Sequence, residues 1–212
     1  MDKEAVQRWD PLSPEEIAEI FSEAAFSWWI AGGYAIEHFV GRSLRPHDDI
    51  DVQLFAADHS SIQSLLADWD CWLAAPPGML RPWAIGETPP LSVSDVWCRE
   101  NERAPWRFQL MLDQRNGPVW QSRRCALVSK PIVELTSRST TGIPFLIPEV
   151  QLFYKARGPR PKDELDFAAA LPSLSDSQIA WLHHAISVAY SVDNAWLSIL
   201  VQRSLSCNSR NL

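Results

Sequence analysis

The segment WIAGGYAIEHFVGRSLRPHDDIDVQLF, residues 29–55, decides the fold that we expect for this chain. It begins within an apolar run, 28–31, that is typical of a short buried strand. After two glycines, residues 34–40 carry apolar side chains at helical spacing, and Gly41 is a residue type that commonly ends a helix. A second strand is predicted over residues 49–55. The order strand, glycine turn, helix and strand predicts an α/β fold.

Gly32 and Gly33 stand between the first predicted strand and the helix. A helix that starts in such a turn exposes backbone N–H groups at its N-terminus, where a phosphate group can bind. We therefore expect the two glycines to bind the phosphates of a nucleotide. The alternative is a turn with no role in binding.

Asp49 and Asp51 lie in the second predicted strand. Alternate residues of a strand share a face, so the apolar residues of 50–54 would face the core and the two carboxylates the opposite side. Their Cα atoms would lie ~7 Å apart, close enough to bind one divalent cation, or two cations ~4 Å apart. Asp48 has the parity of the apolar set and is not assigned to the pair. The alternative is an acidic strand end that is only solvated. This alternative is the less frequent one when a Gly-Gly turn and a helix precede the carboxylates.

The string WWIAGGYAIEHFVGRSLRPHDDIDV resembles the signature of the DNA-polymerase-β-type nucleotidyltransferase superfamily. Gly32-Gly33 are followed, after fifteen residues, by Asp49-Ile50-Asp51. The string is similar in particular to the aminoglycoside and lincosamide nucleotidyltransferases of bacteria. The match is specific over residues 28–55 and weaker as far as about residue 172.

The resemblance implies a small mixed β-sheet flanked by helices, followed by a C-terminal helical segment. We expect a nucleotidyltransferase domain over residues 1–146 and a helical region over residues 147–212. The implied reaction is Mg²⁺-dependent transfer of a nucleoside monophosphate, most often AMP, from ATP or another nucleoside triphosphate to a hydroxyl group. Two Mg²⁺ ions are the expected cofactors, and the expected acceptor is a small hydroxylated molecule of the aminoglycoside or lincosamide type.

Asp113 is the third carboxylate that we assign to the site, as a metal ligand and as the general base. It ends a predicted strand, 106–113, in which its parity separates it from the alternating apolar residues. A strand next to the Asp49 strand would bring Asp113 into the same cleft, and the resemblance also implies an acidic residue at such a position. The alternative is an aspartate that serves the Asn116-Gly117 turn, from which a partner strand is predicted to return over residues 119–128.

Basic residues are the expected partners of the triphosphate. Arg42 and Arg45 lie in the loop between the glycines and the carboxylates, where they could also form ion pairs with Asp48 or Glu37. Lys155, in a helix predicted from Pro148, and Lys162, which begins the next predicted helix, correspond by resemblance to cations near the nucleotide. A solvated helix lysine is the alternative for both.

The segments that follow are predicted mainly as structural elements of the domain. Helix 59–69 and strands 72–74 and 92–99 would complete the sheet and its cover. Residues 76–90 form a long loop rich in proline and glycine, in which Trp83 could stack on a sugar or base. Packing of Trp83 against the core is the more frequent alternative.

Composition restricts the function classes. The net charge of −7 argues against general nucleic-acid binding and is compatible with a cationic acceptor. The four cysteines are scattered and suggest no disulfide framework, so we expect a reduced protein. The sequence has neither an apolar signal core nor a 20-residue apolar run, so we expect a cytoplasmic protein without a membrane span. Three alternatives remain: a protein- or tRNA-modifying nucleotidyltransferase of the toxin–antitoxin type, a non-catalytic nucleotide-binding module, and a purely structural glycine turn.

Overall fold

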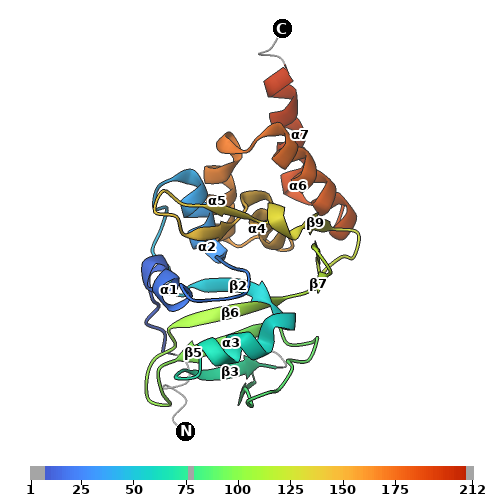
Figure 1. The fold of residues 1–212 in the computed structure, drawn as a ribbon. Helices are drawn as coiled ribbons and strands as arrows, with labels where there is room; N and C mark the ends of the chain where they lie inside the picture. Colours follow the sequence, from blue (N-terminus) through green and yellow to red (C-terminus); the bar gives the residue numbers. More distant parts are fainter. Residues whose placement is uncertain (1–7, 76–78, 209–212) are drawn as a thin grey trace.

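A computed structural model describes residues 8–75 and 79–208 of the chain (Figure 1). An eight-stranded mixed sheet forms its centre and is larger than the small sheet expected from the sequence. Its strands lie in the order β10 (Thr136–Arg138), β11 (Pro144–Leu146), β1 (Trp28–Ile30), β2 (Asp51–Phe55), β6 (Phe108–Asp113), β5 (Asp95–Arg99), β3 (Asp70–Ala74) and β4 (Leu80–Pro82). A separate three-stranded antiparallel sheet contains β7 (Arg115–Asn116), β8 (Val119–Gln121) and β9 (Ser129–Pro131).

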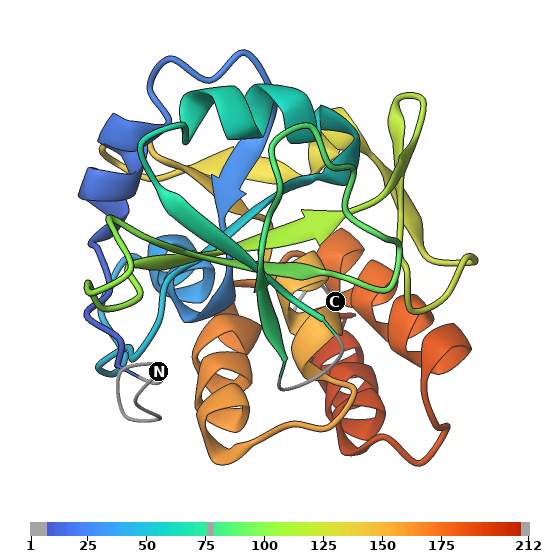
Figure 2. The same cartoon turned by 90° about the horizontal axis from the view of Figure 1, so that it is seen from below.

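The helices of the described chain fall into an early and a late group. They are α1 (Pro14–Ile20), α2 (Gly32–Val40), α3 (His59–Leu65), α4 (Pro148–Lys155), α5 (Pro161–Ala170), α6 (Asp176–Ala189) and α7 (Ala195–Asn208), with single 3₁₀ turns at Ala56–Asp58, Ile132–Glu134 and Leu171–Ser173. Seen from below, α3 lies on one side of the large sheet and the C-terminal helices lie on the other (Figure 2). Within the described residues, no helix combines the length and apolar character needed to cross a bilayer.

The segment β1–α2–β2 forms as the sequence predicts. β1 pairs antiparallel with β2, and the first residue of α2 is Gly32 itself, two residues earlier than the predicted start. Gly41 ends α2 with φ 72°, a left-handed conformation that glycine adopts without the steric cost of a Cβ atom. The observed strand β2 begins at Asp51, so Asp49 lies in the loop that precedes it.

Strand β6 has the predicted alternation but not the predicted partner. Phe108, Leu110 and Leu112 are buried, as expected for the core face. The chain after Gly117 was expected to return beside this strand over residues 119–128. Instead β6 lies between β2, which is parallel to it, and β5, which is antiparallel, and the hairpin at Gly117 pairs within the second sheet.

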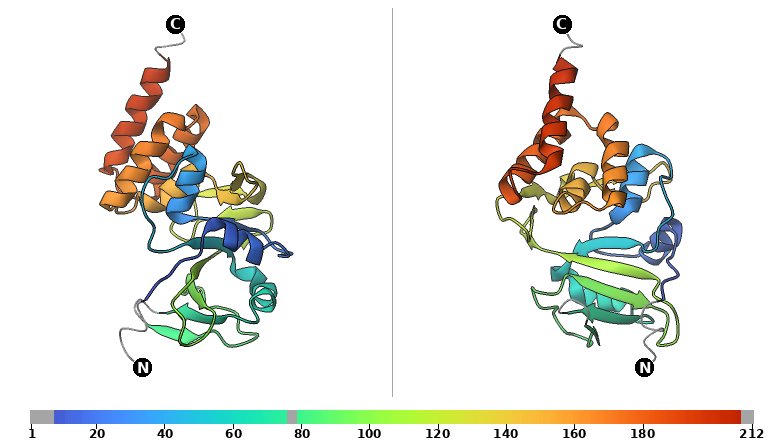
Figure 3. Two further views of the ribbon diagram at one scale, coloured as in Figure 1. Left: turned by 90° about the vertical axis from the view of Figure 1, so that its left-hand side faces the viewer. Right: turned by 180° about the vertical axis from the view of Figure 1, so that it is seen from behind.

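One hydrophobic core connects the sheet to the late helices. Buried side chains from the strands, such as Val52 and Leu110, belong to the same cluster as Phe153 of α4 and Phe167 of α5. Helix α4 packs against α2, so the late helices lie close to the glycine turn. The two further views show α7 extending away from the sheet (Figure 3).

Candidate active site

Asp49 and Asp51 stand at the start of β2. Asp51 is the first residue of the strand and Asp49 precedes it by two residues. Ile50 and Val52 are fully buried in the core, which leaves the Asp51 carboxylate on the opposite face of the strand, as the alternation predicts. Asp48 is exposed to solvent.

Gly32 brings the N-terminus of α2 against Asp51. Its φ is 66°, and a Cβ atom at this position would overlap the Asp51 carboxylate. The Gly32 N–H donates a hydrogen bond of 2.8 Å to the Oε1 atom of Gln151 in α4. Gly32 is therefore required for the close packing of turn, carboxylate and late helix, whatever further role its backbone has in binding a phosphate.

Arg45 and His47 lie against Gly33, where a Cβ atom would overlap their side chains. Arg45 forms an ion pair of 3.4 Å with Asp166 of α5 and lies 3.1 Å from Nδ1 of His47. The ion-pair partner of the Arg45 guanidinium is thus in a late helix, and only the backbone N–H of Arg45 donates to Glu37, at 3.2 Å. The loop between the glycines and the carboxylates is held against α5 by this contact.

Arg42 lies away from the cleft. Its side chain is exposed and lines a separate hollow of about 440 Å³ together with Glu15, His38 and Thr141. Neither carboxylate of the Asp49–Asp51 pair lines this hollow. The structure therefore does not bring Arg42 together with the predicted nucleotide site.

Lys155 is held in a buried network of charges. Its Nζ atom lies 2.9 Å from Oδ1 of Asp163 and 2.8 Å from Oδ2 of Asp166. Burial opposes ionisation of Asp163, but hydrogen bonds from Arg160 and Lys155 lower the pKa of Asp163 below its ordinary value. Lys155 is consequently a fixed cation with two carboxylate partners, rather than the mobile point charge expected from the sequence.

Lys162, at the start of α5, is half-buried and forms no hydrogen bond or ion pair within the described part of the chain. Burial, followed by the neighbouring charge of Asp49, raises the pKa of Asp51 to about 7, and the positive charges of Lys155 and Lys162 oppose this rise. Lys162 is therefore near enough to act on Asp51 electrostatically. Its charge is available to a ligand in the cleft.

Asp113 is not brought to the Asp49–Asp51 pair. The register of the parallel strands places Asp51 opposite Gln109 and Asp113 opposite Phe55, four residues further on. At about 3.3 Å per residue, this separates Asp113 from Asp51 by ~13 Å along the strands. Alternation predicted the face of Asp113 correctly, but it carries no information about position along that face.

The Asp113 carboxylate instead joins three elements. It is buried and accepts hydrogen bonds from Gln53 (2.7 Å), Tyr154 of α4 (2.6 Å) and Trp120 of β8 (2.5 Å). Burial raises the pKa of Asp113, although the hydrogen bonds from Tyr154 and Trp120 act in the opposite direction. Its contacts connect the large sheet to the second sheet and to the late helices.

Asp95, which the sequence analysis did not assign to the site, is the carboxylate that faces the pair. It begins β5, and its Oδ1 atom accepts a hydrogen bond of 3.0 Å from Gln109, the residue opposite Asp51 in β6. The negative charge of Asp95 also contributes to the raised pKa of Asp51. Asp95 could have been found only from the strand order β2–β6–β5, because its residue type and parity are not distinctive.

The donor set suits Mg²⁺. Among the described residues there is no group of three or more histidine, cysteine, aspartate or glutamate side chains arranged to hold a metal ion. Mg²⁺ is commonly bound by one or two carboxylates together with waters and substrate phosphates, so Asp49 and Asp51 would suffice. The pKa of Asp51 is raised first by burial and then by the charge of Asp49, and a bound cation would favour the ionised carboxylate against both effects.

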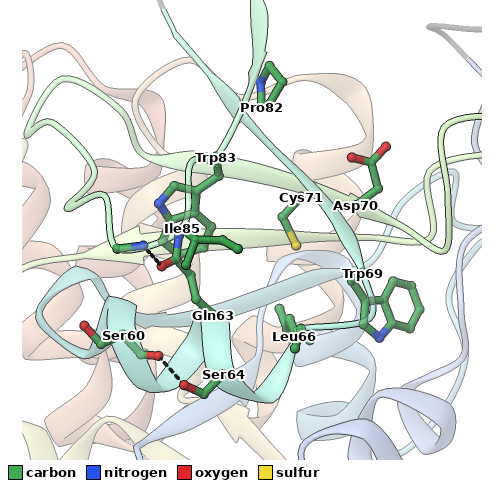
Figure 4. Close-up of a pocket in the computed structure, with 12 residues that line it drawn as sticks. Ser60, Gln63, Ser64, Leu66, Trp69, Asp70, Cys71, Pro82, Trp83 and Ile85 are labelled. Carbon is green, nitrogen blue, oxygen red and sulfur yellow. Dashed lines mark hydrogen bonds between the residues drawn. The ribbon is translucent and has the colours of Figure 1, made fainter.

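A further hollow lies between α3 and the chain after β4 (Figure 4). Gln63 of α3 fixes this chain, donating to the carbonyl of Ala84 and accepting from the N–H of Gly86. Trp83 is buried there and donates to the carbonyl of Glu87, so it packs the loop onto the core, as the more frequent alternative predicted. Residues 76–78 of the predicted loop lie outside the described residues.

Comparison with protein families identifies one related segment. Residues 15–74 match the model of the aminoglycoside-2''-adenylyltransferase family. The matched segment includes both glycines of the turn and the carboxylates Asp49 and Asp51, and it covers less than a third of the chain. A comparison with curated protein sequences found no significant match.

Two solved structures of antibiotic-modifying proteins are similar over most of the chain. The solution structure of the antibiotic-resistance factor ANT(2'')-Ia has a TM-score of 0.51 and 13% identity, covering 93% of this chain and 94% of that one. The lincomycin-bound crystal structure of the lincosamide antibiotic adenylyltransferase LnuA has a TM-score of 0.51 and 16% identity, covering 76% of this chain and 97% of that one. These likenesses confirm the nucleotidyltransferase fold, and the family match confirms the predicted resemblance and enzyme class.

Proposed function

We propose that this chain transfers a nucleoside monophosphate, most often AMP, from a Mg²⁺-bound nucleoside triphosphate to a hydroxyl group of a small molecule. The observation that carries the proposal is that Gly32 packs against the Asp51 carboxylate, while Asp95 is joined by a hydrogen bond to Gln109, the residue opposite Asp51. Gln109 pairs with Asp51 across the two strands and donates this hydrogen bond to Asp95 in the next strand. The antibiotic acceptors named for the relatives suggest aminoglycosides or lincosamides as the first acceptors to test.

Asp49 and Asp51 are the residues that would hold Mg²⁺, which prefers oxygen ligands. When bound, Mg²⁺ would neutralise charge on the phosphate oxygens and on the leaving pyrophosphate. Whether one ion or two bind is a separate question, because two carboxylates with phosphate oxygens suit either number. The N–H groups of the first turn of α2, other than that of Gly32, which donates to Gln151, would meet the phosphates once the side chains of Arg45 and His47 move away from Gly33.

The positive side chains around the cleft would bind the triphosphate. Lys162 has no partner within the described residues. The hydrogen bond from Arg160 to Asp163 is the main cause of the raised pKa of Arg160, and the charges of Asp49 and Asp51 add to it. Lys155 supplies a fixed positive charge beside Asp51. Arg45 reaches the triphosphate only if it leaves Asp166, and Arg42 has no proposed role.

Asp95 is the proposed general base in place of Asp113. It would accept the proton of the acceptor hydroxyl while the hydroxyl oxygen forms a bond to the α-phosphorus. The bond from the α-phosphorus to its bridging oxygen breaks, and pyrophosphate leaves with the bonding electrons. The hydrogen bond from Gln109, the residue opposite Asp51, fixes one oxygen of the Asp95 carboxylate. We place this chemistry in the cytoplasm, where nucleoside triphosphates are available.

The direct test is incubation with each labelled nucleoside triphosphate, Mg²⁺ and a panel of aminoglycosides, lincosamides and other hydroxylated small molecules. Mass spectrometry would report an acceptor heavier by one nucleoside monophosphate, with release of pyrophosphate. The Asp49→Asn variant should give no product, and the Asp48→Asn variant, altered at the exposed neighbouring position, should remain active. A protein that neither binds a nucleotide in the presence of Mg²⁺ nor modifies any acceptor would contradict the proposal.

A further inference from the structure

A hollow of about 590 Å³ opens beside the start of β5 and is lined mainly by polar groups. Its walls come from the chain before β5, from the turn after β8 and from the C-terminal ends of α4 and α6. The side chains that matter to its chemistry are Ser92, Ser94, Arg123, Arg124, Arg157 and Tyr190. Its volume is in the range of sites that bind small molecules.

The hollow contains three arginines, and no carboxylate is among the described residues that line it. This is unusual in a chain whose net charge is −7. Arg123 and Arg157 are exposed, and neither forms an ion pair or hydrogen bond within the part of the chain that the structure describes. Asp113 does not neutralise Arg123, because Asp113 is buried, which raises its pKa, and it already accepts four hydrogen bonds. The hollow therefore has an unneutralised positive charge.

Arg124 is fixed in its position. It donates to the hydroxyl of Tyr190 at 3.0 Å, and its guanidinium lies 4.9 Å from the ring centre of Tyr154. A fixed arginine beside two unpaired ones forms a preorganised site for an anion, because a guanidinium group offers paired donors to a carboxylate or phosphate.

The hollow is connected to the proposed acceptor side of the cleft. Ser94, which lines it, donates a hydrogen bond to Oδ2 of Asp95, the proposed base. Arg157 follows Lys155 by two residues at the end of α4. A molecule bound in the hollow would thus extend toward the group that removes the hydroxyl proton.

On the basis of the proposed function, we infer that the natural acceptor is a small hydroxylated anion whose carboxylate or phosphate group binds to Arg123 and Arg157. A polycationic aminoglycoside would bring like charges to this hollow, which is unfavourable. A long polyanion such as RNA fits less well, because it requires an extended basic face and the chain is acidic overall.

Binding can be measured without catalysis. Calorimetry with a hexose phosphate, a hexuronic acid and the uncharged hexose, in the absence of nucleotide and Mg²⁺, should show binding of the two anions only. Arg123→Gln and Arg157→Gln should each weaken that binding by about tenfold or more, since a hydrogen bond to a charged group is lost. Arg103→Gln, an exposed position in the turn that follows the opposite end of β5, is the matched control and should change the affinity by less than about twofold.

The transfer assay then separates the inference from the proposed function. We expect anionic acceptors to be modified in preference to aminoglycosides, and the double arginine variant to lose this preference while it still binds Mg²⁺–nucleotide. Efficient modification of an aminoglycoside, unaffected by the arginine variants, would overturn the inference and leave the proposed function standing. Equal weakening of nucleotide and anion binding by Arg157→Gln would assign the hollow to the nucleotide and would also overturn it. Anion binding through the arginines with no transfer to any acceptor would instead reject nucleotidyl transfer.

Discussion

Asp51 is buried and lies close to a second carboxylate, Asp49, and both conditions oppose its ionisation. Burial and the charge of Asp49 raise the pKa of Asp51 to about 7. A carboxyl group with a raised pKa binds its proton more tightly in the folded protein than in the unfolded chain. The free energy of unfolding should therefore fall as the pH rises from about 4 to about 7. Binding of a cation would compensate for this loss of stability.

Replacing Asp51 should separate stability from activity. In the absence of metal at pH 8, Asp51→Asn should unfold at a temperature equal to or above that of the wild type, with a gain of up to roughly 1 kcal/mol, since the cost of the buried charge is removed. The difference should shrink at pH 5, where Asp51 is protonated. Mg²⁺-dependent nucleotide binding should be lost. Calorimetric melting and nucleotide titration would test both, and Asp48→Asn, at an exposed position, should behave as the wild type.

Asp95 and Asp113 should respond in opposite ways to the same substitution. Asp95→Asn should reduce turnover by about 10²–10⁴-fold with little change in nucleotide affinity, because a general base is removed. Asp113→Asn should mainly lower stability, by about 1–3 kcal/mol, because its oxygens accept several buried hydrogen bonds. Single-turnover rates and melting temperatures of both variants would decide between them. A catalytic defect confined to Asp113→Asn would return the role of base to that residue.

At the scale of one element, the N-terminus of α2 distinguishes the two glycines. Gly32→Ala should destabilise the fold by about 1–3 kcal/mol, because φ is 66° and the new Cβ atom would meet Asp51. Gly33→Ala should cost less stability, since its Cβ atom would meet the ends of two flexible side chains, and it should weaken nucleotide binding instead. Denaturant melts and nucleotide titrations would measure the two effects. A larger loss of stability for Gly33→Ala would contradict this assignment.

Local patterns predicted the elements that carry their own periodicity. The strand, glycine turn, helix and strand of residues 28–55 could be predicted because each alternation or helical stripe lies within a few residues. The face of Asp113 followed from the same alternation, but its distance from Asp51 depends on the register of β2 against β6. Asp95 could not be assigned to the site, because its approach to the pair depends on the order β2–β6–β5, which is set by pairing between distant segments. The ion pair of Arg45 with α5 is also a tertiary contact that local sequence does not indicate.

At the scale of the whole molecule, the late helices complete the site that the sheet begins. Gln151 of α4 accepts the hydrogen bond of Gly32, and Tyr154 donates to Asp113. Lys155 supplies a cation near Asp51. The division into a domain of residues 1–146 and a helical region of residues 147–212 stays a prediction. Buried side chains from both ranges belong to a single hydrophobic core.

We therefore expect the chain to unfold as one cooperative unit. A truncated chain of residues 1–146 should lose its cooperative thermal transition and its Mg²⁺-dependent nucleotide binding. Its sheet would expose the apolar surface that Val150, Leu152 and Phe153 cover, and buried apolar groups of this size contribute about 1.5–3 kcal/mol each. Gln151→Ala is the control, because it removes one hydrogen bond across the division and should cost only about 1 kcal/mol while the melt stays cooperative. Circular dichroism melts with and without nucleotide would test both proteins. A truncated chain that melts cooperatively and still binds nucleotide would mean that the late helices are an independent appendage, and that the cations of α4 and α5 are dispensable for the nucleotide site.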